Sequence, residues 1–560
     1  MAKKGDGILK SVWGSDGALP VHVAAKKGFV DCVDFMLDHG CAVDDRDKDP
    51  KRGGAVIHYA SWGGSLALVR YLLQRGADAG LTDVVGNTPI LYSIYGGSRE
   101  CCEEFLRRGR SLRETNHKQH SAVLQASCGG HLHLVKWLLD EQGHTLADRD
   151  LDGNSALLFA AWGGHRELME YLLARGEDIN QCNNNGHNIL LSAANGGRTH
   201  IVEWLLEQGF DIECHNNNND TALLLACYGG HLQLVQRLLQ LGAKRTTNAC
   251  GFTPLLSAAN GSQLAMCAWL LENGSSLDEC DNDSYNALIL AACSGSIELV
   301  RFLLEKGADA GSRNSNGDSC LLLASYCAHA PLVAWLLDHG YAALDEVNNT
   351  RMTALISAAN GGALDVIHLL LDRLRGQSLE DTDEGGYTAL LLAAQRGHLA
   401  CVQALAAYGA NVQAVTSRHH NSAISLAVDY PDVQAYLHHV WELSALEVAV
   451  DVRDVDRVHV LLAAGAAPTP RALQLAQTTA PYAGARAPVP ELTKMLQLAM
   501  QPWSPRNHAL HGPAFAQGLL QLFMVKRAVE AQGHLPFLPL ELWHMIGSFV
   551  DRSFFAEPAP

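Results

Sequence analysis

Short apolar segments alternate with glycines and polar turns along most of this chain. In the segment that begins at Gly251, Thr253 precedes Pro254 as an N-cap residue precedes a proline in the first helical turn, and an apolar run follows. A second kind of segment, such as 232–239, carries apolar residues at helical spacing and ends before Gly242. Turns rich in Asp and Asn, such as 214–219, come next. The pattern predicts pairs of short helices joined by tight turns.

The predicted helix pair recurs about every 33 residues. The residue that follows the Ala-Ala pair of the first helix, or its equivalent in each unit, marks this period. We call these positions the ladder: Lys26, Trp62, Tyr95, Cys128, Trp162, Asn195, Tyr228, Asn260, Cys293, Tyr326, Asn360 and Gln395. A fixed period of this length is typical of a solenoid, in which each unit stacks only on its neighbours. The 560 residues therefore do not imply several globular domains.

The repeating unit resembles the ankyrin repeat. The resemblance rests on Thr88–Pro89, Thr253–Pro254, the run from Leu19 to Ala25, and Gly-Ala-Asp at Gly76–Asp78 and Gly307–Asp309. It implies an all-α solenoid of about fourteen helix-turn-helix units. Many units depart from the family by having Ala-Leu-Leu where Pro-Leu-His is usual, as at Ala222–Leu224. Because that histidine normally bridges neighbouring turns, we expect these junctions to depend more on apolar packing.

The period also sets the expected domain boundaries. Residues 1–16 are expected to form an N-terminal capping segment, and residues 17–467 the repeat array, with weaker units starting near His420 and Glu442. The period is lost after Ala467, and residues 468–512 are rich in Pro, Ala and Gln, which predicts a helical cap and a linker. Residues 513–560 are apolar again and predict a small helical segment.

The last segment contains one recognisable helical motif. Pro539 stands at a predicted helix start, and Leu542, Ile546, Phe549 and Val550 share one face. The string resembles the first helix of an F-box, as in poxvirus-type and protist ankyrin proteins that end in a truncated F-box-like domain. In those proteins the helix docks on the Skp-type adaptor of a cullin ubiquitin ligase. The resemblance implies that the docking residues are Leu538, Pro539, Leu542, Ile546, Phe549 and Val550. The alternatives are a helix that only caps the solenoid and a SOCS-box-like, elongin-binding tail.

Composition and motifs narrow the function further. The net charge is -17 with no basic block, which does not favour nucleic acid or an anionic membrane as a partner. The fifteen cysteines form no CxxC pair and the 26 histidines are dispersed, so we expect reduced thiols, no metal and no cofactor. Phosphate-binding, dinucleotide-binding, metalloprotease and hydrolase motifs are missing from the sequence, so we expect no enzyme. We expect a cytoplasmic location, or the host cytoplasm for a viral or parasite source.

The ladder is the predicted binding site. In an ankyrin array this position lies near the end of the first helix and faces the concave groove, and a glycine follows it in most units. Aromatic side chains there can anchor apolar groups, and asparagines can pair with the amides of an extended peptide. The predicted groove residues are Trp62, Tyr95, Trp162, Asn195, Tyr228, Asn260, Tyr326 and Asn360. The alternative is that the aromatic side chains pack on the neighbouring helix and only stabilise the stack.

Two functions follow from the array and its tail. In the first, the chain is a substrate-recruiting adaptor of a Skp/cullin-type ubiquitin ligase, with a protein target bound in the groove. In the second, it is an ankyrin scaffold or decoy that holds a protein partner without a link to ubiquitin machinery.

Overall fold

The computed structural model describes residues 18–49, 52–374, 378–441, 443–452, 454–463, 466–477 and 493–497. Within these residues the regular elements are helices, and extended pairing is limited to four isolated bridges between turn residues, such as His215 with Thr221. The predicted all-α solenoid is confirmed. The expected capping segment 1–16 and the expected F-box-like segment 513–560 lie outside the described residues.

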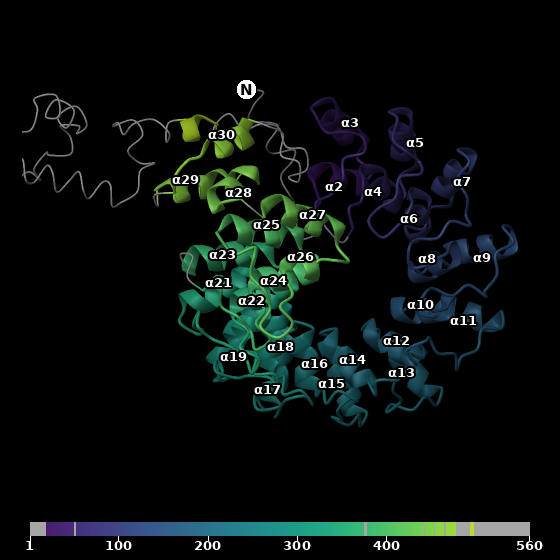
Figure 1. Cartoon of the computed structure of the whole chain (residues 1–560). Helices are drawn as coiled ribbons and strands as arrows, with labels where there is room; N and C mark the ends of the chain where they lie inside the picture. The colour runs from purple at the N-terminus through teal and green to yellow at the C-terminus, as the bar shows by residue number, and fades with distance from the viewer. Residues whose placement is uncertain are drawn as a thin grey trace, which may run out of the picture. The chain divides into compact units, whose positions relative to one another are not determined.

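The helices form two compact units, Met1–Ala287 and Leu288–Pro560. Within each unit most repeats contribute an inner helix, which stacks on the next inner helix of that unit, and an outer helix, which packs against its own inner helix (Figure 1). In the first unit the inner helices are α2 (Pro20–Lys26), α4 (Val56–Trp62), α6 (Pro89–Tyr95), α8 (Ala122–Cys128), α10 (Ala156–Gly163), α12 (Ile189–Asn195), α14 (Ala222–Tyr228) and α16 (Pro254–Asn260). The outer helices are α3 (Val30–Asp38), α5 (Leu66–Gln74), α7 (Arg99–Arg107), α9 (Leu132–Asp140), α11 (Arg166–Ala174), α13 (Thr199–Glu207), α15 (Leu232–Gln240) and α17 (Leu264–Glu272).

The second unit repeats the same arrangement from α18 (Ala287–Ser294) onward. Its other inner helices are α20 (Cys320–Tyr326), α22 (Ala354–Gly361), α24 (Ala389–Gln395), α26 (Ala423–Leu426), α28 (Ala445–Asp451) and α30 (Pro470–Gln477). Its outer helices are α19 (Ile297–Glu305), α21 (Ala330–Asp338), α23 (Leu364–Leu374), α25 (Leu399–Ala407), α27 (Pro431–Val440) and α29 (Val455–Ala463). The weak unit predicted at His420 has the shortest inner helix, α26, since Pro431 already begins α27.

Small residues and polar caps explain why the inner helices stack closely. The Ala-Ala pairs, such as Ala160 and Ala161, are fully buried and leave room for the neighbouring helix. A Ser, Thr or Asn at the N-cap accepts a hydrogen bond from the third helical residue in most inner helices, as Thr253 does from Leu256 at 3.3 Å. The local sequence therefore sets where each inner helix begins.

Two histidines bridge the first junctions in the way the family resemblance implies. Nδ1 of His58 accepts the Ala55 N–H at 3.0 Å, and Nε2 donates to the carbonyl of Leu81 in the next turn at 2.9 Å. His22 makes the equivalent bonds to Leu19 and Asp45. Both rings are fully buried.

Where the histidine is missing, a glutamate replaces it at several junctions. The hydroxyl of Thr88 donates to Oε2 of Glu114 at 2.7 Å, while Oε1 of the same glutamate accepts a backbone N–H from Ser111 at 3.1 Å. Thr253 pairs with Glu279 and Ser319 with Glu346 in the same way. At these three junctions a part-buried polar bridge therefore takes the place of the histidine. Greater dependence on apolar packing stays a prediction for the Ala-Leu-Leu unit at Ala222–Leu224.

Candidate protein-binding groove

The ladder residues lie at the C-terminal ends of the inner helices, as predicted. Trp62, Tyr95, Asn195, Tyr228, Asn260 and Tyr326 are the last residues of their helices, and Trp162 and Asn360 are next to last. The side chains of Trp162, Tyr228 and Tyr326 are 41%, 49% and 48% exposed. Such exposure of large aromatic groups leaves them free to contact a partner.

The glycine that follows most ladder residues is required by close stacking. A Cβ placed on Gly96 would lie 2.2 Å from the carbonyl oxygen of Trp62, and one on Gly196 would lie 2.0 Å from that of Trp162. Both distances are far below van der Waals contact. Each glycine thus lets one ladder residue approach the backbone of the preceding one.

Trp62 and Tyr95 also pack against neighbours. The ammonium group of Lys26 lies 3.2 Å from the centroid of the Trp62 ring, and the Trp62 and Tyr95 rings are 6.0 Å apart between centroids. Burial raises the pKa of the Tyr95 hydroxyl. At this end of the array the packing interpretation of the ladder therefore holds in part.

A cavity of about 310 Å³ opens beside these two rings. Its lining combines ladder residues of three successive repeats with residues of the turns: Arg52, Trp62, Val85, Asn87, Leu91, Tyr92, Tyr95, Asn116, Lys118, His120, Gln125 and Cys128. The described lining contains two cations and no carboxylate. Tyr92 of this lining donates its hydroxyl to Asp83 at 2.9 Å, and the nearby Tyr59 donates its hydroxyl to Asp47 at 2.7 Å. We call the surface formed by the ladder and the adjoining turns the groove.

A column of side chains from the outer helices caps the ladder carbonyls. Nε2 of His131 lies 2.9 Å from the carbonyl oxygen of Tyr95, and Nε2 of His231 lies 3.0 Å from that of Asn195. The same bond is made by His165, Arg198, Gln263, His329 and His398. Because these backbone carbonyls already accept hydrogen bonds within the array, a partner segment would contact the side chains of the ladder rather than its carbonyl groups. The sequence interpretation missed this column, although the recurring Gly-Gly-His string was its signal.

The three asparagines of the predicted site differ in their surroundings. The Asn260 side chain is exposed, whereas Asn195 and Asn360 are half-buried. Oδ1 of Asn360 accepts a hydrogen bond from Nε of Arg396 at 2.9 Å, so part of its capacity is used between repeats. Pairing with peptide amides stays a prediction for all three.

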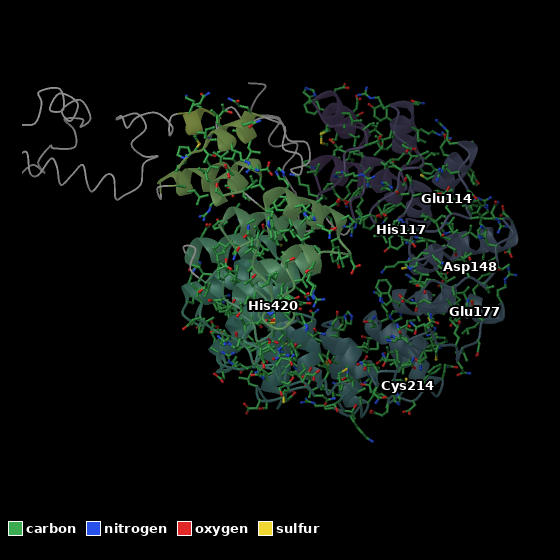
Figure 2. The ribbon with its side chains drawn as sticks, in the orientation of Figure 1. Glu114, His117, Asp148, Glu177, Cys214 and His420 are labelled. Carbon is green, nitrogen blue, oxygen red and sulfur yellow. The ribbon has the colours of Figure 1, made fainter. Side chains whose placement is uncertain are left out.

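The turn tips, which are the polar turns between successive repeats, are fixed by their own Asp and Asn side chains. Oδ1 of Asn216 accepts the N–H groups of Asn218 at 2.9 Å and Asp220 at 2.8 Å. The amide of Asn217 donates to the carbonyl of Asn184 in the preceding tip at 3.1 Å. Figure 2 shows where these turns lie through the labelled Glu114, His117 and Cys214. Bonds between tips hold the edge of the groove rigidly.

Other predicted features are tested only in part. The docking residues Leu538, Pro539, Leu542, Ile546, Phe549 and Val550 lie outside the described residues. Among the residues that the structure describes, no three His, Cys, Asp or Glu side chains cluster as metal ligands would. No helix in the same ranges has the length and apolar character needed to cross a bilayer.

Family comparisons cover most of the chain. Six overlapping matches to the family described as "Ankyrin repeats (3 copies)" span residues 4–383, and a match to "Ankyrin repeat" covers residues 385–417. None of the matched families is an F-box, so the predicted segment 513–560 gains no support from them.

Several curated proteins share part of the array. The transient receptor potential cation channel subfamily A member 1 of Homo sapiens is 28% identical over 129 residues, 22% of this chain and 11% of that protein. Palmitoyltransferase AKR1 of Lachancea kluyveri is 29% identical over 144 residues, 25% of this chain and 19% of that protein. Ankyrin repeat domain-containing protein 63 of Mus musculus is 36% identical over 119 residues, 20% of this chain and 30% of that protein. The chain therefore spans less than a third of the length of each.

Proposed function

The chain belongs to the ankyrin-repeat family, and we propose that it is a protein-interaction scaffold that holds an extended protein segment along its groove. Ankyrin repeats generally bind protein partners. The observation that carries the proposal is the pair of partly exposed Trp162 and Tyr228 at the ends of stacked helices in the first unit, with Tyr326 at the same helix position in the second unit. Aromatic side chains on a rigid support contribute most to protein interfaces, often about 2 kcal/mol or more each.

The cavity beside Trp62 supports the same proposal. At about 310 Å³ it matches one or two side chains of a partner better than a large cofactor. Its rings provide apolar contact, and Arg52 and Lys118 provide positive charge within a chain whose net charge is -17. The capped ladder carbonyls and bonded turn tips keep this surface in place before a partner binds, which lowers the entropic cost of binding.

Affinity capture with matched variants tests the groove. The full chain, Trp162→Ala and Tyr228→Ala are compared with Phe35→Ala, which removes an even more exposed aromatic side chain (57%) from the outer helix α3. We expect the two groove variants to lose the same captured proteins, at unchanged melting temperature, while Phe35→Ala retains them. Equal capture by all four proteins contradicts the proposal.

A second candidate function is the ubiquitin-ligase adaptor, which is favoured only by the sequence of the tail. The spacing of Leu538, Leu542 and Ile546 suits a helix that docks on a Skp-type adaptor. A pull-down with purified Skp-type adaptor and, in parallel, with elongin distinguishes the two boxes considered for this tail. Capture of the Skp-type adaptor that is lost in Leu542→Asp and Ile546→Asp supports the adaptor function. Capture of the Skp-type adaptor that is unchanged in these variants, or absent altogether, contradicts the adaptor function. The scaffold function then remains as the proposal.

A further inference from the structure

A second cavity, of about 400 Å³, lies between two successive turns of the first unit. Its lining residues are Leu112, Arg113, Thr115, Gln119, Ser121, Gly143, His144, Thr145, Asp148 and Arg149. The volume falls within the range of small-molecule sites, roughly 300 to 1,000 Å³. The lining is mostly polar, which is unusual for a packing defect between repeats.

This cavity is separate from the groove. Thr115 and Gln119 of one turn line it, whereas Asn116, Lys118 and His120 of the same turn line the cavity beside Trp62. The two linings share no residue. A ligand held in this cavity therefore contacts none of the residues that line the cavity beside Trp62.

One buried hydroxyl in the cavity has no partner. Ser121 is 9% exposed, and its Oγ atom makes no hydrogen bond within the described structure. Ser121 is the N-cap residue of α8, yet unlike most N-cap serines and threonines here it does not cap its own helix. A buried polar atom without a partner costs about 1–3 kcal/mol, so this hydroxyl requires an explanation.

The missing partner follows from one shorter side chain. At three other junctions the N-cap hydroxyl donates to a glutamate that stands two residues before the Asp or Asn of the turn, as Thr88 does to Glu114. At the next junction the corresponding residue is Asp148, two residues before Asp150 (Figure 2). Aspartate is one methylene shorter than glutamate, and no bond joins Asp148 to Ser121. The space left by the shorter carboxylate is part of the cavity.

Two guanidinium groups, those of Arg113 and Arg149, line the same cavity as this hydroxyl. Among the described residues the Arg113 guanidinium has no carboxylate partner, and it lies near enough to the His144 ring for its charge to affect the pKa of that ring. Burial and then Arg113 lower the pKa of His144, while Asp148 of its own turn opposes them. Arg149 adds a second guanidinium, anchored to the carbonyl of Leu146 at 2.8 Å and facing Glu177 at 3.7 Å. Asp148 is the one acidic residue in the lining.

We propose that this cavity binds a small oxyanion ligand, a phosphate monoester or a carboxylate, through the Arg113 guanidinium, the Ser121 hydroxyl and the His144 ring. A guanidinium binds the paired oxygens of either group in bidentate fashion. The hydroxyl of Ser121 donates to a third oxygen or to the second edge of the ligand, which satisfies the buried atom. Thr115 and Thr145 stand at the rim of the cavity as further donors.

Calorimetry on the full chain tests the site with inorganic phosphate, glycerol 3-phosphate and succinate as probes. These probes separate the two ligand types, since only the first two carry phosphate oxygens. We expect saturable binding of at least one probe, weakened about tenfold or more in Arg113→Met and several-fold in Ser121→Ala. The Ser121 change is not expected to unfold the protein, because the side chain makes no native bond.

Asp148→Glu is the decisive variant. The longer carboxylate can reach Ser121 and restore the bridge that Glu114, Glu279 and Glu346 make at their junctions. We expect this variant to melt at a higher temperature and to lose the probe. Asp148→Asn removes the one negative charge of the lining and is expected to bind the probe more tightly.

The role of His144 is tested with sulfate, whose charge does not change between pH 6.0 and pH 7.5. A bound anion favours the imidazolium, so sulfate should bind more tightly at pH 6.0, and His144→Gln should abolish that difference. Binding that is absent for every probe at millimolar concentration, or unchanged in Arg113→Met and Asp148→Glu, overturns the proposal. Neither result bears on the groove, whose variants are assayed separately.

Discussion

Nε2 of His131, the N-cap residue of the outer helix α9, lies 2.9 Å from the carbonyl oxygen of Tyr95, the last residue of the inner helix α6 of the previous repeat. The bond joins two repeats at the ladder. It satisfies a carbonyl that the helix end would leave without an intrahelical partner. A contact between repeats therefore supplies the hydrogen bond that the helix itself cannot provide at its C-terminal end.

We predict that His131→Ala lowers the free energy of unfolding by about 1–2 kcal/mol, because it leaves the half-buried Tyr95 carbonyl without its donor. The measurement is the urea midpoint of the full chain at constant pH. His131→Gln is the matched control, since Gln263 already makes the equivalent bond to the Tyr228 carbonyl at 3.2 Å. Equal losses in the two variants would show that ring packing, rather than the hydrogen bond, matters.

The turn tips lead to a second prediction. Asn216→Ala removes the acceptor for two backbone N–H groups and the donor to Nε2 of His187 at 2.8 Å. We expect a loss of about 2–3 kcal/mol in unfolding free energy. The double swap Asn216→Asp, Asp220→Asn keeps the acceptor and avoids two facing carboxylates, because it reproduces the Asp150–Asn154 pair of an earlier tip, and it should lose less than half as much. Chemical denaturation of the three proteins checks the order.

Close stacking at the ladder leads to a third prediction. In Gly196→Ala the new Cβ would lie only 2.0 Å from the Trp162 carbonyl oxygen, so the two inner helices must separate. We expect destabilisation of about 3 kcal/mol, the upper end for overpacking. Gly311→Ala is the control, because its Cβ meets only the flexible Asp309 carboxylate at 3.3 Å. A similar melting temperature for both variants would contradict the stacking argument.

Much of the fold could be predicted from the sequence because the period is a local property. The Thr253–Pro254 helix start and the ladder at helix ends follow from capping and apolar spacing within one unit. The hydrogen bond from Thr88 to Glu114 could not be predicted in this way, because the two residues belong to different units. Nothing in the local sequence around either residue indicates that it contacts the other.

The candidate sites illustrate the same limit. The positions of Trp162 and Tyr228 were predictable, but their exposure depends on the neighbouring repeats. The unpartnered Ser121 hydroxyl depends on a single methylene, the difference between Asp148 and the glutamate used elsewhere. The effect of this one methylene on the hydrogen bonding of Ser121 cannot be read from the amino-acid composition, but it is visible in the geometry of the junction.

The buried histidines at the first junctions make stability depend on pH. Desolvation lowers the pKa of both His22 and His58 in the folded state from the ordinary value of 6.5. Nδ1 of each ring accepts an N–H from the residue before its helix, so protonating that atom would break the bond. The folded protein therefore favours the neutral ring, and the unfolded chain binds protons first.

For this reason the free energy of unfolding should fall as the pH drops below about 6.5, and it should continue to fall until the folded-state pKa is reached. The slope is at most about 1.4 kcal/mol per pH unit for each histidine. Urea unfolding at pH 7.5, 6.5 and 5.5 measures the decline. In the double variant His22→Gln, His58→Gln the decline should be shallower, because glutamine at the third helical position can accept the same N–H without titrating. A slope that is identical in the double variant would assign the pH dependence to other groups.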